Sequence, residues 1–442
     1  MKSVLRAMQS DPSSVSVVGY GVSSKAVIDY FQKRGINPTV RVMSYVPNIP
    51  LDCQITENYL DTTEELVFRS PAIRPDKIKH VGTLSSEIAL ALSLLDGYKI
   101  GVTGSDGKTT TSTLIYNILK RANKSATLCG NIGKSALETV DSSDKSTFTV
   151  CELSSFQLFD MTPSLDTAII TNITQNHLDW HTDMREYITA KRNILINARH
   201  LVLDFDSEVT RNLANGLESK KITLFSSHTP TFSRESTHAV YIKQGVIYHD
   251  RVPIIPINEI GLRGDFNVKN VQCAISSCIG LCDISAIREE CRAFKGVSGR
   301  MSEVLNKSGV TYIDSAIDTT PARTISTLSA FEKSKTIAIL GGYDKNLDYE
   351  CLYDAVRGIK LAVLCGQSAG KIYKAISGAC DIRVAHDLES ATKIAIGEAK
   401  SGDFVILSPA SASFDEFRNY KEKSEKFKQI VKETEQNDEG PS

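Results

Sequence analysis

The sequence predicts an α/β protein of about three domains with mainly parallel sheets, and three observations lead to this prediction. First, 442 residues give room for about three domains at roughly 150 residues each. Second, short apolar runs that end in Gly, Ser or Asn alternate with helical stretches, as buried parallel strands do. Third, one of these runs leads through a glycine-rich turn into an amphipathic helix. Such an architecture places ligands at the carboxyl ends of its strands.

The predicted strands are the apolar runs themselves. In chain order they are SVSVVGYG, YKIGVTGS, STFTVCEL, DTAIITNI, HLVLDFD, KTIAILGG, LAVLCG and DFVILSP. The segment SSEIALALSLLDGYK predicts a helix and a turn before the second of them. A new α/β pattern begins after KGVSGRMSEV, so we expect domain boundaries near residues 97 and 298. The expected domains are 1–97, 98–297 and 298–442.

The composition is that of a globular protein with substantial cores, since 41% of residues are hydrophobic and 23% are charged. A net charge of −1 gives no general attraction to nucleic acid or to an acidic membrane surface. The N-terminal MKSVLRAMQSDPSS lacks the apolar region of a secretory signal, and no run is long enough to span a bilayer. We therefore expect a cytosolic protein with local binding sites, no nucleic-acid partner and no membrane insertion.

The ten cysteines are scattered without CxxC pairs or metal-type spacing. Cys273, Cys278 and Cys282 fall within VQCAISSCIGLC, which we expect to form one apolar helix. Cysteines of this kind usually behave as small core residues in a reducing compartment. Core packing is therefore favoured over a metal site.

The first strand leads into an imperfect Rossmann-type turn, Gly19-Tyr20-Gly21-Val22-Ser23-Ser24. Ser24 stands where the last glycine of that pattern would be. The following strand ends without the acidic residue that would hold a ribose hydroxyl. A dinucleotide cofactor is therefore disfavoured.

The glycine-rich turn lies within IGVTGSDGKTTTSTLIYNIL. Backbone N–H groups of such a turn, at the start of a helix, form a cradle for phosphate. Lys108 would reach the terminal phosphates, and the Thr109 hydroxyl would contact Mg²⁺. The strict Walker spacing needs a glycine at position 102, which is Val. Gly101, Gly104 and Gly107 can nevertheless form the same kind of phosphate-binding turn. Nucleotide binding is favoured over an ordinary strand-to-helix turn.

Two later segments also follow predicted strands. Glu152, in CELSSFQL, is placed to hold Mg²⁺, although a carboxylate at a strand end is more often solvated or capping. His177, in TNITQNHLDWH, is a candidate metal ligand or proton carrier, although a lone histidine is usually packing or surface. Lys191, in YITAKRNIL, would by itself be read as a solvated helical lysine.

These motifs occur in the order of a known family. G-x-x-G-x-x-G-K-T-T-T, ELSSFQL, GNIG, LGGYDK and LSPASASFDEF resemble the ATP-dependent Mur ligases, and among them the branch that adds D-glutamate. The resemblance implies a Rossmann-like UDP-sugar domain, a central P-loop ATPase-type domain and a C-terminal Rossmann-like amino-acid domain. It implies a monomer that uses ATP and two Mg²⁺ ions to join D-glutamate to UDP-N-acetylmuramoyl-L-alanine, in peptidoglycan precursor synthesis.

The resemblance also implies which residues bind the nucleotide and metal. Lys108, Glu152, His177 and Lys191 would be catalytic, and metal would contact Thr109, Glu152, His177 and Lys191, the last as a carbamate. ATP would contact Gly104, Ser105, Asp106, Gly107, Lys108, Thr109, Thr110, Asn267, Asn270, Arg300 and Asp314. Helix capping is the alternative role for Asn267. Ser315 is the alternative to Asp314, because the register of residues 312–321 is not fixed.

The implied contacts with the other substrates come from several segments. These residues are Gly19, Asn131, Ser154, Gln157, Thr320, Lys345, Ser413, Phe414 and Tyr420, with Thr319 as the alternative to Thr320. The chain departs from the family pattern at Asp106, Asn176, Phe266 and Gly299. The last three of these departures leave a catalytically silent nucleotide or UDP-sugar binder as one alternative. Another Mur ligase and a folylpolyglutamate-type ligase are further alternatives because they share the glycine-rich loop, although ELSSFQL and LSPASASFDEF argue against them.

Overall fold

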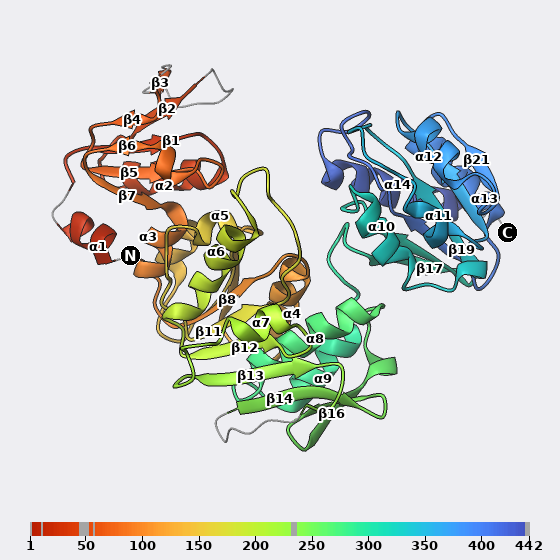
Figure 1. Cartoon of the computed structure of the whole chain (residues 1–442), viewed down its shortest axis with the longest axis horizontal. Coiled ribbons are helices and arrows are strands. Elements are labelled where there is room, and N and C mark those ends of the chain that lie inside the picture. The colour runs from red at the N-terminus through yellow and green to blue at the C-terminus, as the bar shows by residue number, and fades with distance from the viewer. Residues whose placement is uncertain (1, 10–11, 44–52, 56–57, 231–236, 438–442) are drawn as a thin grey trace. The chain divides into compact units, whose positions relative to one another are not determined.

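A computed structural model describes residues 2–9, 12–43, 53–55, 58–230 and 237–437 of the chain. The chain forms two compact units. The first contains residues 1–260 and 269–292, and the second contains residues 261–268 and 293–442. Figure 1 shows the elements coloured along the chain.

The first sheet of unit 1 is wholly parallel and has five strands in the order β3-β2-β1-β5-β7. Its strands are β1 (Val15–Val18), β2 (Thr39–Val42), β3 (Cys53–Ile55), β5 (Leu66–Arg69) and β7 (Thr83–Ser86). Around them lie α1 (Lys2–Gln9), α2 (Val22–Gln32), α3 (Glu87–Leu94) and the pair β4 (Asp61–Thr62) and β6 (Lys79–His80). All side chains of β1 and β5 are buried, and most of them are apolar, as expected of strands covered on both faces.

The second sheet of unit 1 has nine strands in the order β16-β15-β14-β13-β12-β11-β8-β10-β9. They are β8 (Tyr98–Thr103), β9 (Ala126–Gly130), β10 (Phe148–Glu152), β11 (Thr167–Ile170), β12 (His200–Asp204), β13 (Lys221–Ser226), β14 (Thr237–Lys243), β15 (Val246–His249) and β16 (Val252–Pro256). Pairing is parallel from β9 to β14 and antiparallel in β14-β15-β16. The associated helices are α4 (Lys108–Arg121), α5 (Ser155–Leu158), α6 (Met184–Ile196), α7 (Glu208–Asn212), α8 (Asp265–Cys278) and α9 (Ile284–Ala293).

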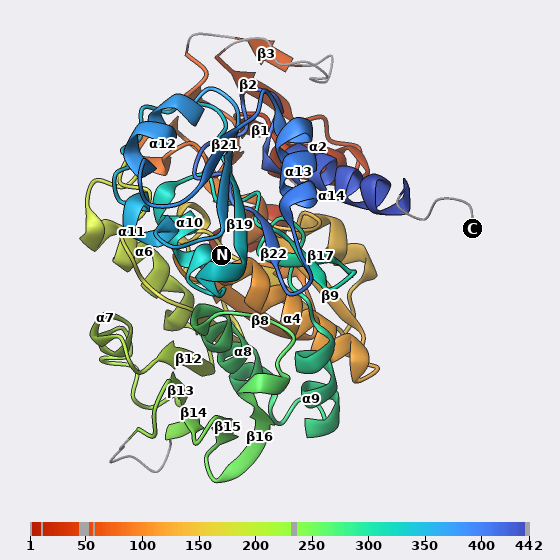
Figure 2. The same cartoon turned by 90° about the vertical axis from the view of Figure 1, so that its right-hand side faces the viewer.

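Unit 2 contains a six-stranded sheet in the order β17-β18-β22-β19-β20-β21, in which only the β17–β18 pair is antiparallel among the described strands. Its strands are β17 (Ser302–Lys307), β18 (Val310–Asp314), β19 (Thr336–Leu340), β20 (Leu361–Leu364), β21 (Ile382–Val384) and β22 (Phe404–Leu407). Its helices are α10 (Pro321–Leu328), α11 (Leu352–Val356), α12 (Ala369–Ile376), α13 (Leu388–Glu398) and α14 (Tyr420–Asn437). Figure 2 shows α13 and α14, which pack against each other.

The prediction of an α/β protein with mainly parallel sheets is confirmed. Each of the eight apolar runs contains a strand, and SSEIALALSLLDGYK forms α3 and the start of β8. Cys273 and Cys278 are buried in α8, as predicted for core residues, but Cys282 is half-buried in the turn after α8, because the helix ends at Cys278. Across the described ranges, no helix has the length and apolar character needed to cross a membrane. The C-terminal residues 438–442 lie outside the described residues, and so does the end of PTVRVMSYV (38–46), the segment expected to form the strand after the first glycine turn.

Candidate active site

The glycine-rich turn joins β8 to α4, and two of its glycines are sterically required. Gly104 has φ of 151° and Gly107 has φ of 80°, values that favour glycine. A Cβ on Gly104 would lie 1.8 Å from Thr171 Oγ1, and one on Gly107 would lie 2.1 Å from Asn270 Oδ1. The backbone at both positions therefore lies closer to its neighbours than any side chain would allow.

The turn is fastened to the segment that follows the neighbouring strand β11. Ser105 N donates to Asn172 O (3.0 Å), and Asp106 N donates to the Asn172 side chain (2.9 Å). Thr171 Oγ1 donates to Asp106 O (2.6 Å), and the hydroxyls of Ser105 and Tyr187 lie 2.8 Å apart. The backbone N–H groups of Ser105 and Asp106, which were expected to bind phosphate, are thus hydrogen-bonded to Asn172. The first helical bond of α4 runs from Thr111 N to Gly107 O, so the N–H groups before it form the anion-binding end of the helix.

A cation and a hydroxyl follow directly on the first turn of α4. Lys108 Nζ donates to Gly104 O (2.9 Å) and Ser105 O (2.8 Å), so it folds back over the turn. Thr109 Oγ1 donates to Glu152 Oε2 (2.8 Å), and the other carboxylate oxygen accepts from Asn131 Nδ2 (3.2 Å). Glu152 is only 1% exposed. The strand ends of β8, β9 and β10 thus bring a hydroxyl, an amide and a carboxylate together.

Lys191 on α6 is buried beside the turn, so its interpretation as a solvated lysine is wrong. Its Nζ donates to Gly104 O (2.7 Å) and lies 4.8 Å from the centroid of the Tyr187 ring. Burial, reinforced by the charge of Lys108, lowers the pKa of Lys191 well below its usual value. Burial also raises the pKa of Tyr187 to about 12. The neutral amine of Lys191 is the form that can react with carbon dioxide to give a carbamate.

His177 lies in the loop after β11, in the left-handed conformation with φ of 56°. Its backbone N donates to the Asn176 side-chain oxygen (2.9 Å). Its ring lies edge-on to Phe156, with centroids 4.9 Å apart. Burial, followed by the charge of Lys108, lowers the pKa of His177. The imidazole is therefore neutral at neutral pH and can act as a ligand.

Three of the expected sugar-nucleotide contacts have structural partners in unit 1. Ser154 caps α5 in a reciprocal capping box, in which Gln157 N donates to Ser154 Oγ (3.2 Å) and Ser154 N donates to Gln157 Oε1 (2.9 Å). Gln157 is 3% exposed. Gly19 ends β1 with φ of 82°, and a Cβ there would lie 2.8 Å from Ile73 Cδ1. These residues shape the loops at the strand ends, and their contacts with substrate stay predictions.

The two asparagines expected to contact adenine lie on α8. Asn267 is inside the helix, where its side chain donates to Arg263 O (2.8 Å), so it does not act as the N-cap. Asn270 is 4% exposed and accepts from Thr111 Oγ1 at 3.4 Å. Asn270 also lies against Gly107, which connects α8 to the glycine-rich turn.

In unit 2, Asp314 is a fully buried residue at the end of β18. Its carboxylate accepts from Gly299 N (2.9 Å), Ser424 Oγ (2.5 Å) and Ala316 N (3.1 Å). Burial raises the pKa of Asp314. Gly299 has φ of 77°, and a Cβ there would lie 3.5 Å from the Tyr420 ring. The bond from Gly299 N to Asp314 therefore fixes the loop that carries Arg300. Thr320, a separate candidate, is the N-cap residue of α10 and is exposed.

The loops after β19 and β22 bring Lys345, Ser413 and Phe414 together. A backbone bridge links Tyr343 to Ala412. Lys345 Nζ lies 5.5 Å from the centroid of the Phe414 ring, which is 59% exposed. Ser413 Oγ is buried and, among the described residues, has no hydrogen-bond partner. An unpaired buried hydroxyl beside a cation and an exposed aromatic ring is suited to a small charged ligand.

Sequence reasoning missed several polar residues within each of the two units. Arg69 is 2% exposed and binds Asp160 through two nitrogens (2.9 and 2.5 Å), and Arg74 binds Glu186 in the same way (2.9 and 3.0 Å). Lys423 is buried on α14 and donates to Gly341 O (2.8 Å). Arg69 and Arg74 are the first and last residues of the segment RSPAIR (69–74), but only the fold reveals their distant partners.

Comparisons with known proteins cover nearly the whole chain. Residues 102–278 match the Mur ligase middle domain, and residues 299–411 match the family described as Mur ligase, glutamate ligase domain. A UDP-N-acetylmuramoylalanine–D-glutamate ligase of Acetivibrio thermocellus is 35% identical over 451 residues, covering 94% of this chain and 96% of that protein. The Clostridium perfringens protein of the same name is 34% identical, covering 95% and 96%.

Two solved structures from Thermotoga maritima share the fold. A UDP-N-acetylmuramate-alanine ligase matches with a TM-score of 0.62 and 19% identity, covering 95% of this chain and 99% of that one. MurF ligase in complex with ADP matches with a TM-score of 0.57 and 17% identity, covering 96% of each chain. At such identities the likeness extends to the fold alone.

Proposed function

Because the chain belongs to the Mur ligase family, we propose that it joins D-glutamate to UDP-N-acetylmuramoyl-L-alanine with consumption of ATP, in peptidoglycan precursor synthesis. The observation that carries this proposal is the cluster of Lys108, Thr109, Glu152 and Lys191 around one glycine-rich turn. The relatives that are 35% and 34% identical over nearly their whole length bear the name of this reaction. The cluster supports the use of ATP and a metal ion, and the names of the relatives support D-glutamate as the amino acid that is added.

The finer domain arrangement is part of the proposal. A UDP-sugar domain would span residues 1–97, an ATP-binding domain residues 98–297, and an amino-acid-binding domain residues 298–442. The five-, nine- and six-stranded sheets each fall within one of these ranges, which supports this division. Sheets of mainly parallel strands bind ligands at their carboxyl ends, so each domain would contribute one substrate site.

The residues around the turn fit ATP and magnesium chemically. Gly104 and Gly107 leave no room for a side chain where the backbone would approach phosphate. A Thr hydroxyl and a carboxylate are oxygen ligands of the kind Mg²⁺ prefers, and the Thr109–Glu152 bond joins them. A carbamate on Lys191 would replace a buried amine with two further oxygens, and His177 would complete the metal contacts. Magnesium bound there would neutralise charge on the phosphates during transfer.

The chain's own groups would act mainly by positioning and charge neutralisation. The start of α4, Lys108 and Thr110 would hold the ATP phosphates, with Ser105 and Asp106 shaping the turn. ATP would transfer its terminal phosphoryl group to the L-alanine carboxylate. The amine of D-glutamate would then attack the acyl carbon, which forms the amide bond and releases phosphate. Asn267 and Asn270 would hold adenine, Arg300 would hold the remaining phosphate oxygens, and Asp314 would contact the nucleotide elsewhere.

The other two substrates would bind at loops of the first and last sheets. Gly19, Asn131, Ser154 and Gln157 would contact the UDP-sugar substrate. For D-glutamate, the cation of Lys345 would pair with a carboxylate, and the unpaired Ser413 hydroxyl would supply a hydrogen bond. Phe414, Tyr420 and Thr320 would complete that site.

The experiment that tests this proposal is phosphate release from ATP and Mg²⁺ with UDP-N-acetylmuramoyl-L-alanine and one candidate amino acid at a time. We expect release that requires D-glutamate and a product of the matching mass. Lys108→Met should abolish it, whereas Lys120→Met, at an exposed position of the same helix, should leave it unchanged. Dependence on another amino acid would preserve the ligase and overturn the D-glutamate assignment. ATP binding without release for any amino acid would favour a silent nucleotide binder.

A further inference from the structure

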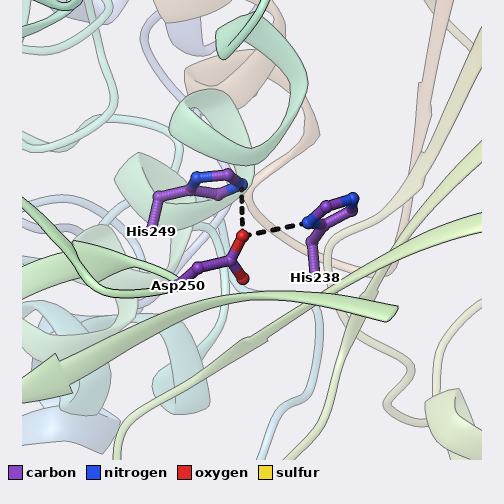
Figure 3. A group of neighbouring side chains, drawn as sticks. All are labelled: His238, His249 and Asp250. Atoms are coloured by element: carbon purple, nitrogen blue, oxygen red, sulfur yellow. Dashed lines mark hydrogen bonds and ion pairs between the residues drawn. The ribbon is translucent and has the colours of Figure 1, made fainter. Parts of the chain in front are cut away.

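A cluster of two histidines and one aspartate lies at the β14–β15 hairpin (Figure 3). His238 is on β14, His249 is the last residue of β15, and Asp250 follows it. One ligand atom of each residue lies within 4.8 Å of the other two. Throughout the described ranges, no other three His, Cys, Asp or Glu side chains meet this spacing. Strands β11, β12 and β13 separate β14 from β8, so the cluster is distinct from the glycine-rich turn.

The hairpin register explains why these side chains converge. Val240 pairs with His249, and His238 lies two residues before Val240, so both imidazoles emerge on the same face of the sheet. A continued strand would direct Asp250 to the opposite face. Instead Asp250 has φ of 53°, a left-handed conformation that Asp tolerates better than most residues. Figure 3 shows its carboxylate turned between the two rings.

The backbone holds this carboxylate in place. Asp250 N donates to Ala239 O (2.7 Å), and Ala239 N donates to Asp250 Oδ1 (2.9 Å). The second oxygen, Oδ2, lies 2.9 Å from His238 Nδ1 and 3.7 Å from His249 Nε2. One carboxylate oxygen therefore fixes the loop, and the other faces both imidazoles.

We propose that His238, His249 and Asp250 bind a divalent transition-metal ion, for which Zn²⁺ is the expected occupant. Zinc bonds to imidazole nitrogen and carboxylate oxygen are about 2.0–2.2 Å long, so tetrahedral ligand atoms are roughly 3.3–3.5 Å apart. The two distances to Asp250 Oδ2 bracket this separation. Mg²⁺ and Ca²⁺ prefer sites made of oxygen alone, so two imidazoles select against them. This proposal is independent of the proposed ligase function.

The protonation states of the cluster suit metal binding. Burial lowers the pKa of His249, which leaves its imidazole neutral at neutral pH. Burial alone would raise the pKa of Asp250, but hydrogen bonds from Ala239 N and His238 lower it overall, so the carboxylate is ionised. A neutral His238 can move its proton from Nδ1 to Nε2 and offer the Nδ1 lone pair without losing a proton. His200 on β12 and Lys221 on β13 are the other titratable groups that act on these rings.

The alternative is a plain hydrogen-bonded pair of His238 and Asp250 with no ligand. The side chains of His238, His249 and Asp250 are 39%, 20% and 41% exposed, so an ion can enter and keep a water ligand. Bound metal would join β14 to the end of β15 and so stabilise the hairpin in proportion to occupancy. A hydrogen-bonded pair would give no metal-dependent stabilisation.

The test is a calorimetric titration of the full chain with Zn²⁺ in excess Mg²⁺, which keeps oxygen-rich sites filled. We expect one tight Zn²⁺ ion per chain and a rise in Tm, and Co²⁺ in its place should show tetrahedral visible absorption. His249→Ala and Asp250→Asn should each weaken Zn²⁺ binding at least about tenfold. Asn also tolerates the left-handed conformation, so Asp250→Asn removes the charge and preserves the turn.

The matched control is His228→Ala. His228 is also a surface histidine beside an aspartate, with Nδ1 3.5 Å from Asp206 Oδ1, but it lacks a third ligand in the described part of the chain. Its removal should leave Zn²⁺ affinity unchanged. The proposal is overturned if the unaltered chain binds no Zn²⁺, or if the cluster variants bind it as tightly as His228→Ala. Circular dichroism of each variant separates lost binding from lost folding.

Discussion

The hydroxyl of Thr109 donates a 2.8 Å hydrogen bond to the carboxylate of Glu152. These residues come from the first turn of α4 and the end of β10, 43 positions apart in the chain. A buried carboxylate usually needs hydrogen-bond donors in place of water. Here Thr109 donates to one oxygen of Glu152, and Asn131 donates to the other. The same pair offers the oxygen ligands that Mg²⁺ prefers.

Glu152→Gln should therefore separate catalysis from stability. The amide can still accept from Thr109, but it carries no charge for a metal ion. We expect ligase turnover to fall by at least about a hundredfold. The free energy of unfolding should stay the same or rise, because a buried charge is removed. Steady-state phosphate release and thermal denaturation measure the two quantities, and normal turnover in this variant would remove Glu152 from the metal site.

Gly104→Ala should disable nucleotide binding. Its Cβ would overlap Thr171 Oγ1, and the backbone φ of 151° is unfavourable for alanine. We expect the turn to shift, with about 1–3 kcal/mol lost from the free energy of unfolding and at least about tenfold weaker ATP binding, which equals about 1.4 kcal/mol.

The control for this change is Gly397→Ala, in the exposed face of α13. A Cβ there meets nothing within 4 Å, and alanine is the better helix former. This variant should gain about 0.5–1 kcal/mol of stability and leave ATP binding unchanged. Equal ATP affinity in both variants would contradict a phosphate cradle at the turn.

The sequence was sufficient for the eight strands with apolar runs and for the turn between β8 and α4, because apolar residues and glycines mark them locally. It was insufficient for the contacts of that turn. The bond from Thr171 to Asp106 forms because β11 lies beside β8 in the sheet, and strand order is a property of the whole fold. For Lys191 only the resemblance to the family indicated a role in the site, since nothing in YITAKRNIL by itself indicates that the amine bonds to Gly104 O.

The sequence analysis did not predict the antiparallel strands β14, β15 and β16 at the edge of the nine-stranded sheet, although the sequence contains a hairpin signal. The segment THAVYIKQGVIYHD has β-branched and aromatic residues on both sides of a Gln-Gly pair, which favours a hairpin. Its His238–His249–Asp250 cluster depends further on register and on the left-handed Asp250. Neither property can be read from residue types, so the cluster could be recognised only in the three-dimensional structure.

Ser413→Ala should affect substrate binding without affecting stability. The Ser413 hydroxyl has no partner to lose among the described residues, so thermal denaturation should be unchanged. If it binds D-glutamate, its loss should raise KM for that substrate about tenfold, as expected for a hydrogen bond to a charged group. KM for ATP should stay constant.

The matched control for Ser413→Ala is Ser411→Ala, two residues away. Ser411 is buried and bonds to Tyr349 (2.9 Å) and Ser368 (2.8 Å). Its loss leaves buried polar partners unsatisfied and should lower stability by about 1–3 kcal/mol. A Ser413→Ala variant that behaves like Ser411→Ala would indicate a structural role for Ser413.

The ion pair of Arg74 and Glu186 should make stability depend on pH in the acid range. It joins the segment after β5 to α6 within unit 1. The hydrogen bonds from Arg74 lower the pKa of Glu186 from 4.5 to about 2. Because this pKa is lower in the folded state, the pair stabilises the fold above pH 4.5, and the contribution is lost as pH falls toward about 2.

Glu186→Gln should therefore be less stable than the unaltered chain at neutral pH, by on the order of 1 kcal/mol for a partly exposed pair. The difference should shrink steadily between pH 4.5 and about 2, where the carboxyl of Glu186 becomes protonated in the unaltered chain as well. Urea denaturation of both proteins across this range measures the difference. Glu433→Gln, on the exposed side of α14, is the control, and its stability should follow that of the unaltered chain at every pH. A difference for Glu186→Gln that is independent of pH would mean that packing of the side chain, rather than its charge, joins α6 to the first sheet.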